Sequence, residues 1–195
     1  MSRKLIAILV CLVFIVLCVN VFVLTKGKEI STYIDDNTYV EDTFIGKIKI
    51  EDLKNKISEI ADKKLETVIV FKNGDIAKQY TYKDLNTKTN QEKVILEIEK
   101  YYSTNLLTRL QKYYSEKDLE KKYSLELIFD DAKIREIIKN DFSEIESVGN
   151  IEYLLQDTSL EVKVVKSKVI DYSNVINELK NSSNDIYVLT TDINP

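Results

Sequence analysis

The sequence predicts an α+β protein that is preceded by one N-terminal transmembrane helix. Residues 5–24 are almost uniformly apolar, which is typical of a membrane-spanning segment. Beyond them, segments with helical periodicity and β-rich segments follow one another without the regular alternation of a parallel α/β sheet. The Asn-Gly dipeptide at 73–74 lies between two β-rich runs and indicates an antiparallel hairpin. These patterns predict a domain of mixed helices and antiparallel strands outside the membrane.

The apolar run at 5–24 (LIAILVCLVFIVLCVNVFVL) has Asn20 as its one strongly polar side chain. At about 1.5 Å per residue, a helix of this length spans about 30 Å, the thickness of a bilayer's hydrocarbon core. A cleavable signal peptide is the alternative, but its apolar stretch is usually about 7 to 15 residues long and ends in small residues. Arg3 and Lys4 precede the run and favour a cytoplasmic N-terminus. We expect a single-pass anchor in the cell membrane with an extracytoplasmic C-terminal domain, and cleavage of the run stays open.

The expected organisation is a cytoplasmic tip at 1–4, the anchor at 5–24, a linker at 25–43 and an α+β domain at 44–195. All 12 tyrosines lie beyond the anchor, and the whole chain has four glycines and one proline. Disordered chains lack aromatic and β-branched residues, so the outer part is expected to be ordered. Its length is enough for one ordinary domain or two small ones.

The elements of this domain follow from local patterns. Apolar residues recur at helical spacing over 50–60, which predicts an amphipathic helix. The hairpin has its strands at 67–72 (TVIVFK) and 76–82 (IAKQYTY). The remaining predictions, in chain order, are a helical pair or one bent helix at 90–114 capped by Asn90, a strand at 123–129, a helix at 134–138 capped by Asp130, a strand at 160–165, a helix at 172–179 capped by Asp171, and a strand at 186–191.

Composition argues against several functions. Without Arg3 and Lys4 the chain has 26 basic and 32 acidic residues, a net charge of −6, whereas nucleic-acid binding needs a basic surface. The absence of histidine removes Ser-His and Cys-His catalysis and the commonest zinc ligand. Cys11 and Cys18 both lie in the apolar run, so the outer part has no disulfide and no thiol nucleophile, and no serine begins an S-x-x-K motif. We predict no catalytic residue and no cofactor, and hence no enzyme.

Adjacent carboxylates occur at 35–36, 51–52 and 130–131, and such pairs serve glycosidases or bind cations. Acidic residues at helix starts, however, also favour the helix dipole, which is the simpler interpretation. The stretch from Asp35 does not form a calcium loop, because Val40 and Gly46 occupy the positions that need glycine and glutamate. We therefore predict no metal site.

One polar and aromatic group suggests a ligand. Tyr101 and Tyr102 precede Asn105 and Arg109, and a second tyrosine doublet follows at 113–114. Sugar rings stack on aromatic faces and form hydrogen bonds with amide and guanidinium groups. We take Tyr101, Tyr102, Asn105 and Arg109 as candidate ligand-binding residues. Core packing is the alternative, because one tyrosine of each doublet lies on the apolar helical stripe.

Five short segments resemble a known domain in sequence and order. In the family patterns below, h is an apolar residue. Residues 45–53 (IGKIKIEDL) correspond to the pattern V-G-G-h-T-x-E-E-A, and residues 80–86 (YTYKDLN) correspond to a strand ending in E-L-G. Residues 105–109 (NLLTR) correspond to G-N-x-x-x-R, residues 156–158 (QDT) to x-D-A, and residues 167–171 (SKVID) to G-x-x-h-D. These patterns resemble the peptidoglycan-binding-type domain found upstream of L,D-transpeptidase and VanW-type domains in Gram-positive cell-wall proteins. Lys47, Asn86, Thr104 and Ser167 replace family glycines, and the exchange at Asn86 fits a left-handed backbone.

The resemblance implies a non-catalytic, membrane-anchored module whose partner is peptidoglycan or another wall protein. It brings no catalytic residue, because the family's cysteine transpeptidase domain is absent from the sequence. Two alternatives stay open. In the first alternative, the outer part is a spacer or protein-interaction domain. In the second, it is the N-terminal part of a truncated L,D-transpeptidase or VanW-type protein.

Overall fold

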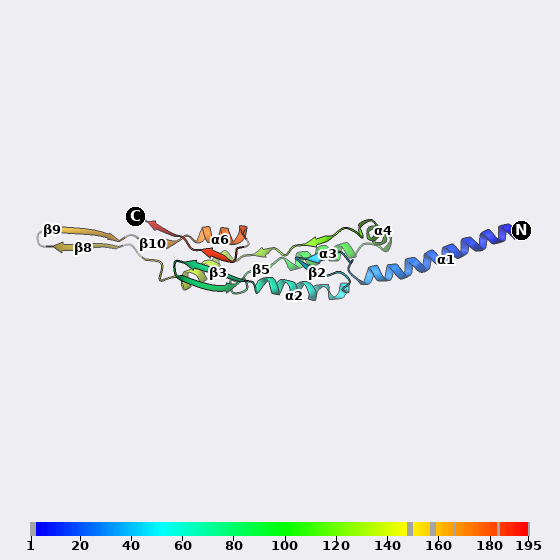
Figure 1. Ribbon diagram of the computed structural model, residues 1–195, viewed down its shortest axis with the longest axis horizontal. Helices are drawn as coiled ribbons and strands as arrows, with labels where there is room; N and C mark the ends of the chain where they lie inside the picture. The colour runs from blue at the N-terminus through cyan, green and yellow to red at the C-terminus, as the bar shows by residue number, and fades with distance from the viewer. Residues whose placement is uncertain (1–2, 148–149, 157–158, 166, 183, 195) are drawn as a thin grey trace. The chain divides into compact units, whose positions relative to one another are not determined.

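The computed structural model describes residues 3–147, 150–156, 159–165, 167–182 and 184–194 (Figure 1). The chain forms two compact units. Unit 1 contains Met1–Ala61 and Asn90–Leu125, and unit 2 contains Asp62–Thr89 and Glu126–Pro195. Both units mix helices and strands, so the predicted α+β class is confirmed. The expected single domain at 44–195 differs from this division, because the chain passes between the units three times.

The elements of unit 1 are α1 (Arg3–Thr32), β1 (Thr38–Val40), β2 (Thr43–Phe44), the 3-10 helix η1 (Ile50–Asp52), most of α2 (Leu53–Leu65), α3 (Gln91–Tyr102), α4 (Leu106–Glu116) and β6 (Lys121–Tyr123). Its sheet has the order β2-β1-β6. The central strand β1 pairs antiparallel with β2 and parallel with β6. The predicted helical pair is confirmed, since α3 and α4 are separated by residues 103–105.

The core of unit 1 is formed by apolar residues that recur at helical spacing on α2 and α3 and by residues of the chain after α1. Its fully buried members are Ile34, Val40, Ile45, Leu53, Ile57, Ile98 and Leu125, with Ile60, Ala61, Val94 and Ile95 beside them. Burial of one such aliphatic side chain stabilises a fold by about 1.5–3 kcal/mol. The stripe predicted over 50–60 therefore holds α2 in unit 1.

The elements of unit 2 are β3 (Val68–Asn73), β4 (Ile76–Thr81), β5 (Lys88–Thr89), β7 (Leu127–Ile128), α5 (Asp131–Asp141), β8 (Asn150–Gln156), β9 (Ser159–Val165), β10 (Ser167–Ile170), α6 (Tyr172–Asn181), β11 (Ile186–Val188) and β12 (Thr191–Asn194). The predicted hairpin is confirmed, with Asn73 opposite Ile76 in an antiparallel pair. Gly74 in its loop has φ +57°, which glycine adopts without strain. The strand β11 joins β3 in parallel, and its Tyr187 is buried together with Phe71.

The expected linker at 25–43 is not a linker in the structure. The helix α1 continues to Thr32, eight residues past the apolar run, and β1 and β2 begin soon afterwards. Gly27 and Ile30 are buried on α1, and Ile34 and Val40 are buried in the core of unit 1. Sequence reasoning missed this because apolar residues are sparse among the polar residues of the segment, although Ile30, Ile34 and Val40 are buried.

Two other expectations were wrong in detail. The predicted strand at 123–129 is two short strands, β6 in unit 1 and β7 in unit 2, and the chain changes units between them. The side chain of Asn90 forms no capping hydrogen bond to α3, whereas Asp130 and Asp171 accept from backbone N–H groups of α5 and α6 at 3.1 Å, as predicted. The motif at 156–158 falls partly outside the described residues.

Two of the positions at which the resembled family has glycine adopt left-handed backbone. Lys47 has φ +63° and Asn86 has φ +55°. The expectation for Asn86 is therefore met, and Lys47 behaves in the same way. A Cβ atom on Gly46 would lie 2.5 Å from the carbonyl oxygen of Asp36 and 2.5 Å from the ring of Phe44, so glycine is required there for space. The two positions of the family's glycine pair thus differ in their constraints, because Gly46 has no room for a Cβ atom and Lys47 has left-handed backbone.

Candidate functional site

The four candidate ligand-binding residues come together at the junction of α1, α3 and α4 in unit 1. Arg109 is only 2% exposed. Its guanidinium donates to the carbonyl oxygen of Tyr102 at 3.1 Å and to that of Ile30. Its Cζ atom also lies 4.1 Å from the centre of the Tyr102 ring, a cation–π contact. The group predicted to meet a ligand therefore holds three helices of this chain together.

Both tyrosines of the first doublet are half-buried and bonded within unit 1. The backbone N–H of Asp35 donates to the Tyr102 hydroxyl at 2.8 Å. The ammonium of Lys121 donates to the Asp35 carboxylate at 2.7 Å and to the Tyr101 hydroxyl at 2.6 Å. The Tyr101 hydroxyl in turn donates to Glu116 at 3.1 Å. This network fixes the chain just after α1 against α3, α4 and β6.

Burial changes the ionisation of this cluster. Desolvation raises the pKa of Tyr101 and of Tyr102 well above the ordinary value of 10.0. The negative charge of Asp35 adds to the increase in both, whereas the hydrogen bond from the backbone N–H of Asp35 opposes it at Tyr102. Desolvation lowers the pKa of Arg109, although Tyr102 and Asp35 oppose that shift. Both hydroxyls therefore stay protonated to a higher pH than that of a free tyrosine, and they act as neutral hydrogen-bonding groups in this network.

Asn105 has a separate structural task. Its side-chain oxygen accepts from the backbone N–H of Thr108 at 2.9 Å and thereby caps α4. The side chains of Asn105 and Arg109 thus both contact the chain itself. Binding of a ligand by the predicted group stays a prediction, and the contacts on each member agree with the packing alternative.

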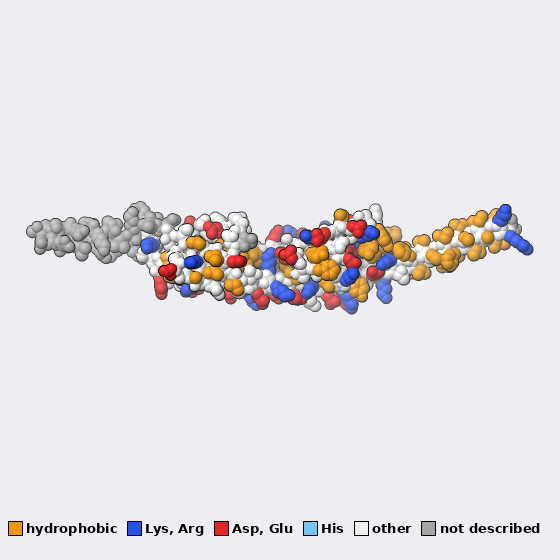
Figure 2. Space-filling view, viewed as in Figure 1, with side chains coloured by type: hydrophobic (Ala, Val, Ile, Leu, Met, Phe, Trp, Pro, Cys, Tyr) orange, Lys and Arg blue, Asp and Glu red, His pale blue; other side chains and the backbone are white. Residues whose placement is uncertain are grey.

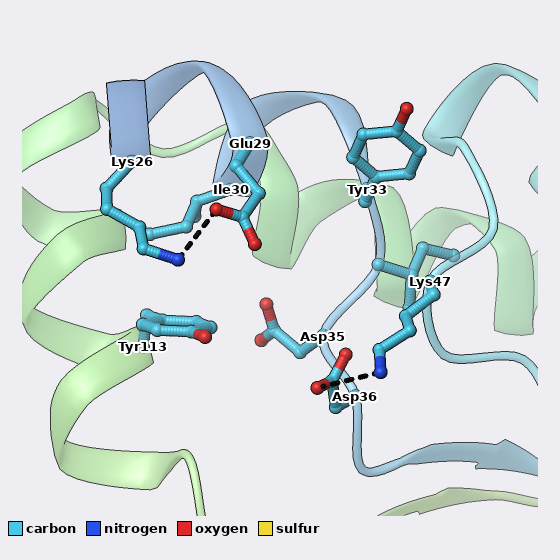
Figure 3. Close-up of a pocket in the computed structure, with 9 residues that line it drawn as sticks. Lys26, Glu29, Ile30, Tyr33, Asp35, Asp36, Lys47 and Tyr113 are labelled. Atoms are coloured by element: carbon cyan, nitrogen blue, oxygen red, sulfur yellow. Dashed lines mark hydrogen bonds and ion pairs between the residues drawn. The ribbon is translucent and has the colours of Figure 1, made fainter. Parts of the chain in front are cut away.

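A pocket of about 510 Å³ opens beside this cluster (Figure 3). Its lining residues are Lys26, Glu29, Ile30, Tyr33, Ile34, Asp35, Asp36, Lys47 and Tyr113. Figure 3 shows the Tyr113 ring entering from α4, opposite Lys47 and near Asp35. Sequence reasoning had noted the carboxylates at 35–36 and the second tyrosine doublet, but nothing local indicates that α1 and α4 bring them together.

The charges of this pocket are paired. Lys26 lies 2.7 Å from Glu29, and Lys47 lies 3.5 Å from Asp36. The third carboxylate, Asp35, forms an ion pair with Lys121, which is not a lining residue of the pocket, at 2.7 Å. Such a surface offers both signs of charge together with two aromatic rings, and it suits a polar ligand that carries amino and carboxylate groups.

Within the described ranges, no group of three or more Asp, Glu or Cys side chains is arranged to hold a metal ion. Comparison with protein-family models, with curated proteins and with solved structures finds no match to this chain.

Proposed function

We propose that this chain is a membrane-anchored, non-catalytic module of the cell envelope, and that its folded part associates with peptidoglycan. The observation that carries the proposal is α1. Among the described helices it alone is long and apolar enough to cross a membrane, and it continues directly into unit 1. Apart from the half-buried Val23, its large apolar side chains are exposed from Leu5 to Leu24, so in water they would be in contact with solvent.

Orientation is part of the same proposal. Arg3 and Lys4 at the start of α1 favour a cytoplasmic N-terminus, which places unit 2 and the part of unit 1 after the apolar run outside the membrane. A cleaved signal peptide is the competing fate of the apolar run. The buried contacts of Gly27 and Ile30 lie after that run, so they do not distinguish the two fates.

The wall association is supported by the resemblance and by two backbone conformations. Lys47 and Asn86 replace family glycines and both have positive φ, as glycine positions of that kind require. Gly46, retained from the same motif, has no room for a Cβ atom. Agreement at three sequence positions in two separate motifs supports a common loop geometry.

The pocket is the surface that we propose meets the wall polymer. Tyr33 and Tyr113 present aromatic faces for sugar rings, and the surrounding lysines and carboxylates suit the charged groups of peptide stems. Lys26 follows the apolar run by two residues, about 3 Å along a helix. The pocket would therefore contact a glycan strand of the wall that lies close to the membrane.

A spacer or protein-interaction domain is the second candidate. The absence of a flexible linker between α1 and β1 favours it, because an ordered junction fixes unit 1 in orientation relative to its anchor. Such a part positions another envelope protein without contacting glycan.

Co-sedimentation with purified sacculi tests the wall association. The full chain in detergent is mixed with washed sacculi over a salt series, and salt-resistant retention is expected. Tyr113→Ala should reduce retention, whereas Tyr114→Ala, at the neighbouring residue outside the pocket, should not. Equal retention of both variants would exclude the pocket, and no retention of a folded full chain would favour the spacer.

A further inference from the structure

The helix α4 carries an exposed apolar face next to the base of the proposed anchor. Leu107 is 73% exposed and Tyr114 is 48% exposed. They are seven residues apart, about two helical turns, and so lie on the same face of α4. We call Leu107 and Tyr114 the α4 patch. Figure 2 shows hydrophobic side chains gathered where α1 and α4 meet.

Direct contacts fix the position of α4 along α1. The Tyr114 ring stacks on Phe22 with ring centres 6.4 Å apart, and Phe22 belongs to the apolar run. At its other end, α4 places Leu106 against Gly27, where an added Cβ atom would be 2.8 Å from a Leu106 methyl group. The helix α4 therefore crosses α1 over the stretch where the apolar run ends.

We propose that the α4 patch inserts into the outer interface of the lipid bilayer and holds the part of unit 1 that follows α1 against the membrane surface. The proposal rests on the proposed membrane span. Tyr114 lies beside a residue two positions inside the end of the apolar run, so it is at the outer boundary of the hydrocarbon core, next to the headgroups, when α1 spans the bilayer. Tyrosine is enriched at that depth because it has an apolar ring and a polar tip.

The argument for lipid, and not another protein, is continuity. Phe22 on α1 is 48% exposed and adjoins the α4 patch through its contact with Tyr114. The same apolar surface thus runs from the proposed span onto α4. Burial of Leu107 in the interface also removes the most exposed apolar side chain of α4 from water.

The chain has no tryptophan, so one introduced tryptophan reports its own depth. Four full-length variants, Leu107→Trp, Tyr114→Trp, Phe14→Trp and Phe44→Trp, are reconstituted in bilayers that contain lipids brominated near the headgroup or near the chain end. Phe14 lies within the apolar run, and Phe44 is an exposed aromatic residue of β2. The last variant controls for the general attraction of tryptophan to interfaces.

We expect shallow bromines to quench the fluorescence of the Leu107→Trp and Tyr114→Trp variants. Deep bromines should quench the Phe14→Trp variant, and neither kind should quench the Phe44→Trp variant. The Leu107→Trp variant is the decisive one. Tyr114 contacts Phe22 of α1, so a tryptophan at position 114 would be close to lipid whenever α1 spans the bilayer.

Quenching of Leu107→Trp by aqueous iodide but not by bromolipid would overturn the proposal. Protection from both quenchers would also overturn it and would indicate a protein cover. Failure of bromines to quench Phe14→Trp would instead contradict the membrane span itself.

Discussion

Arg109 of α4 donates a hydrogen bond to the carbonyl oxygen of Ile30 in the last turn of α1. Its second bond, 3.1 Å long, reaches the carbonyl of Tyr102, the last residue of α3. The final carbonyls of a helix have no partner within that helix, and they attract cations through the helix dipole. One buried guanidinium therefore satisfies the ends of two helices and fixes both to a third.

Loss of this link is expected to destabilise unit 1. Arg109→Ala leaves two carbonyl acceptors without the guanidinium, and each such loss costs about 1–3 kcal/mol. Arg109→Lys should recover only part of the stability, since an ammonium lacks the planar fork that reaches two acceptors. Urea unfolding in detergent, followed by circular dichroism, measures both changes. Gln111→Ala, an exposed site on α4, is the control, and equal stability of Arg109→Ala and this control would refute the link.

Gly46→Ala should cost about 1–3 kcal/mol, the usual range for an overpacked site. Its methyl group would meet the Asp36 carbonyl oxygen, which belongs to the backbone and moves little, as well as the Phe44 ring. Adding Phe44→Ala should therefore fail to restore stability, as measured by thermal unfolding. Full restoration in the double variant would show that the backbone contact is unimportant.

Lys47→Gly is expected to make unit 1 more stable than Lys47→Ala by about 1 kcal/mol. Left-handed backbone costs a residue with a Cβ atom about 1–2 kcal/mol, and glycine avoids this cost. The greater conformational freedom of glycine in the unfolded chain offsets part of the gain. Both variants lose the exposed ion pair with Asp36, so their difference isolates the backbone. Chemical denaturation compares them directly. If Lys47→Ala were the more stable of the two, the left-handed conformation would be in doubt.

The folded chain should lose stability in alkaline solution. Burial raises the pKa of Tyr101 and Tyr102 in the folded state, so the unfolded tyrosines release their protons first. The stabilisation is complete below the unfolded pKa near 10.0 and declines as the pH rises above it. Tyr102→Phe should flatten this decline. Denaturation midpoints at about pH 8 and about pH 11 measure it, with Tyr114→Phe as the control for loss of a hydroxyl.

Asn105→Ala separates a structural from a ligand role. Loss of the cap on α4 should cost about 1 kcal/mol and lower the melting temperature, while retention on sacculi stays unchanged for the folded fraction. Asn105→Asp keeps a capping oxygen and should retain stability. Reduced retention at an unchanged melting temperature would instead restore Asn105 as a ligand-binding residue.

Local chemistry predicted much of the fold. The Asn-Gly signal identified the β3–β4 hairpin, and Asp130 and Asp171 cap helices as expected, because each pattern depends on neighbouring residues alone. The division at 103–105 between α3 and α4 was also predicted as one of two options. The same Asn105 that entered the predicted ligand group is the cap that begins α4.

Long-range contacts limited the remaining predictions. The segment 25–43 resembled a linker because its order depends on Arg109, Tyr102 and Lys121, all distant in sequence. The pocket likewise needs Tyr113 on the same side of unit 1 as Asp35, and the two units need a chain that leaves unit 1 and returns. Neither periodicity nor spacing within one segment encodes such pairings.

Retention of α1 as an anchor is the central claim, and the intact mass of the membrane-extracted protein tests it most directly. Cells that express the full chain are fractionated, membranes are washed with high salt and urea, and the protein is extracted in detergent. We predict that the chain stays in the membrane fraction at its full mass of 22.6 kDa. A shorter chain that lacks residues 5–24 and appears in the soluble fraction would contradict the account.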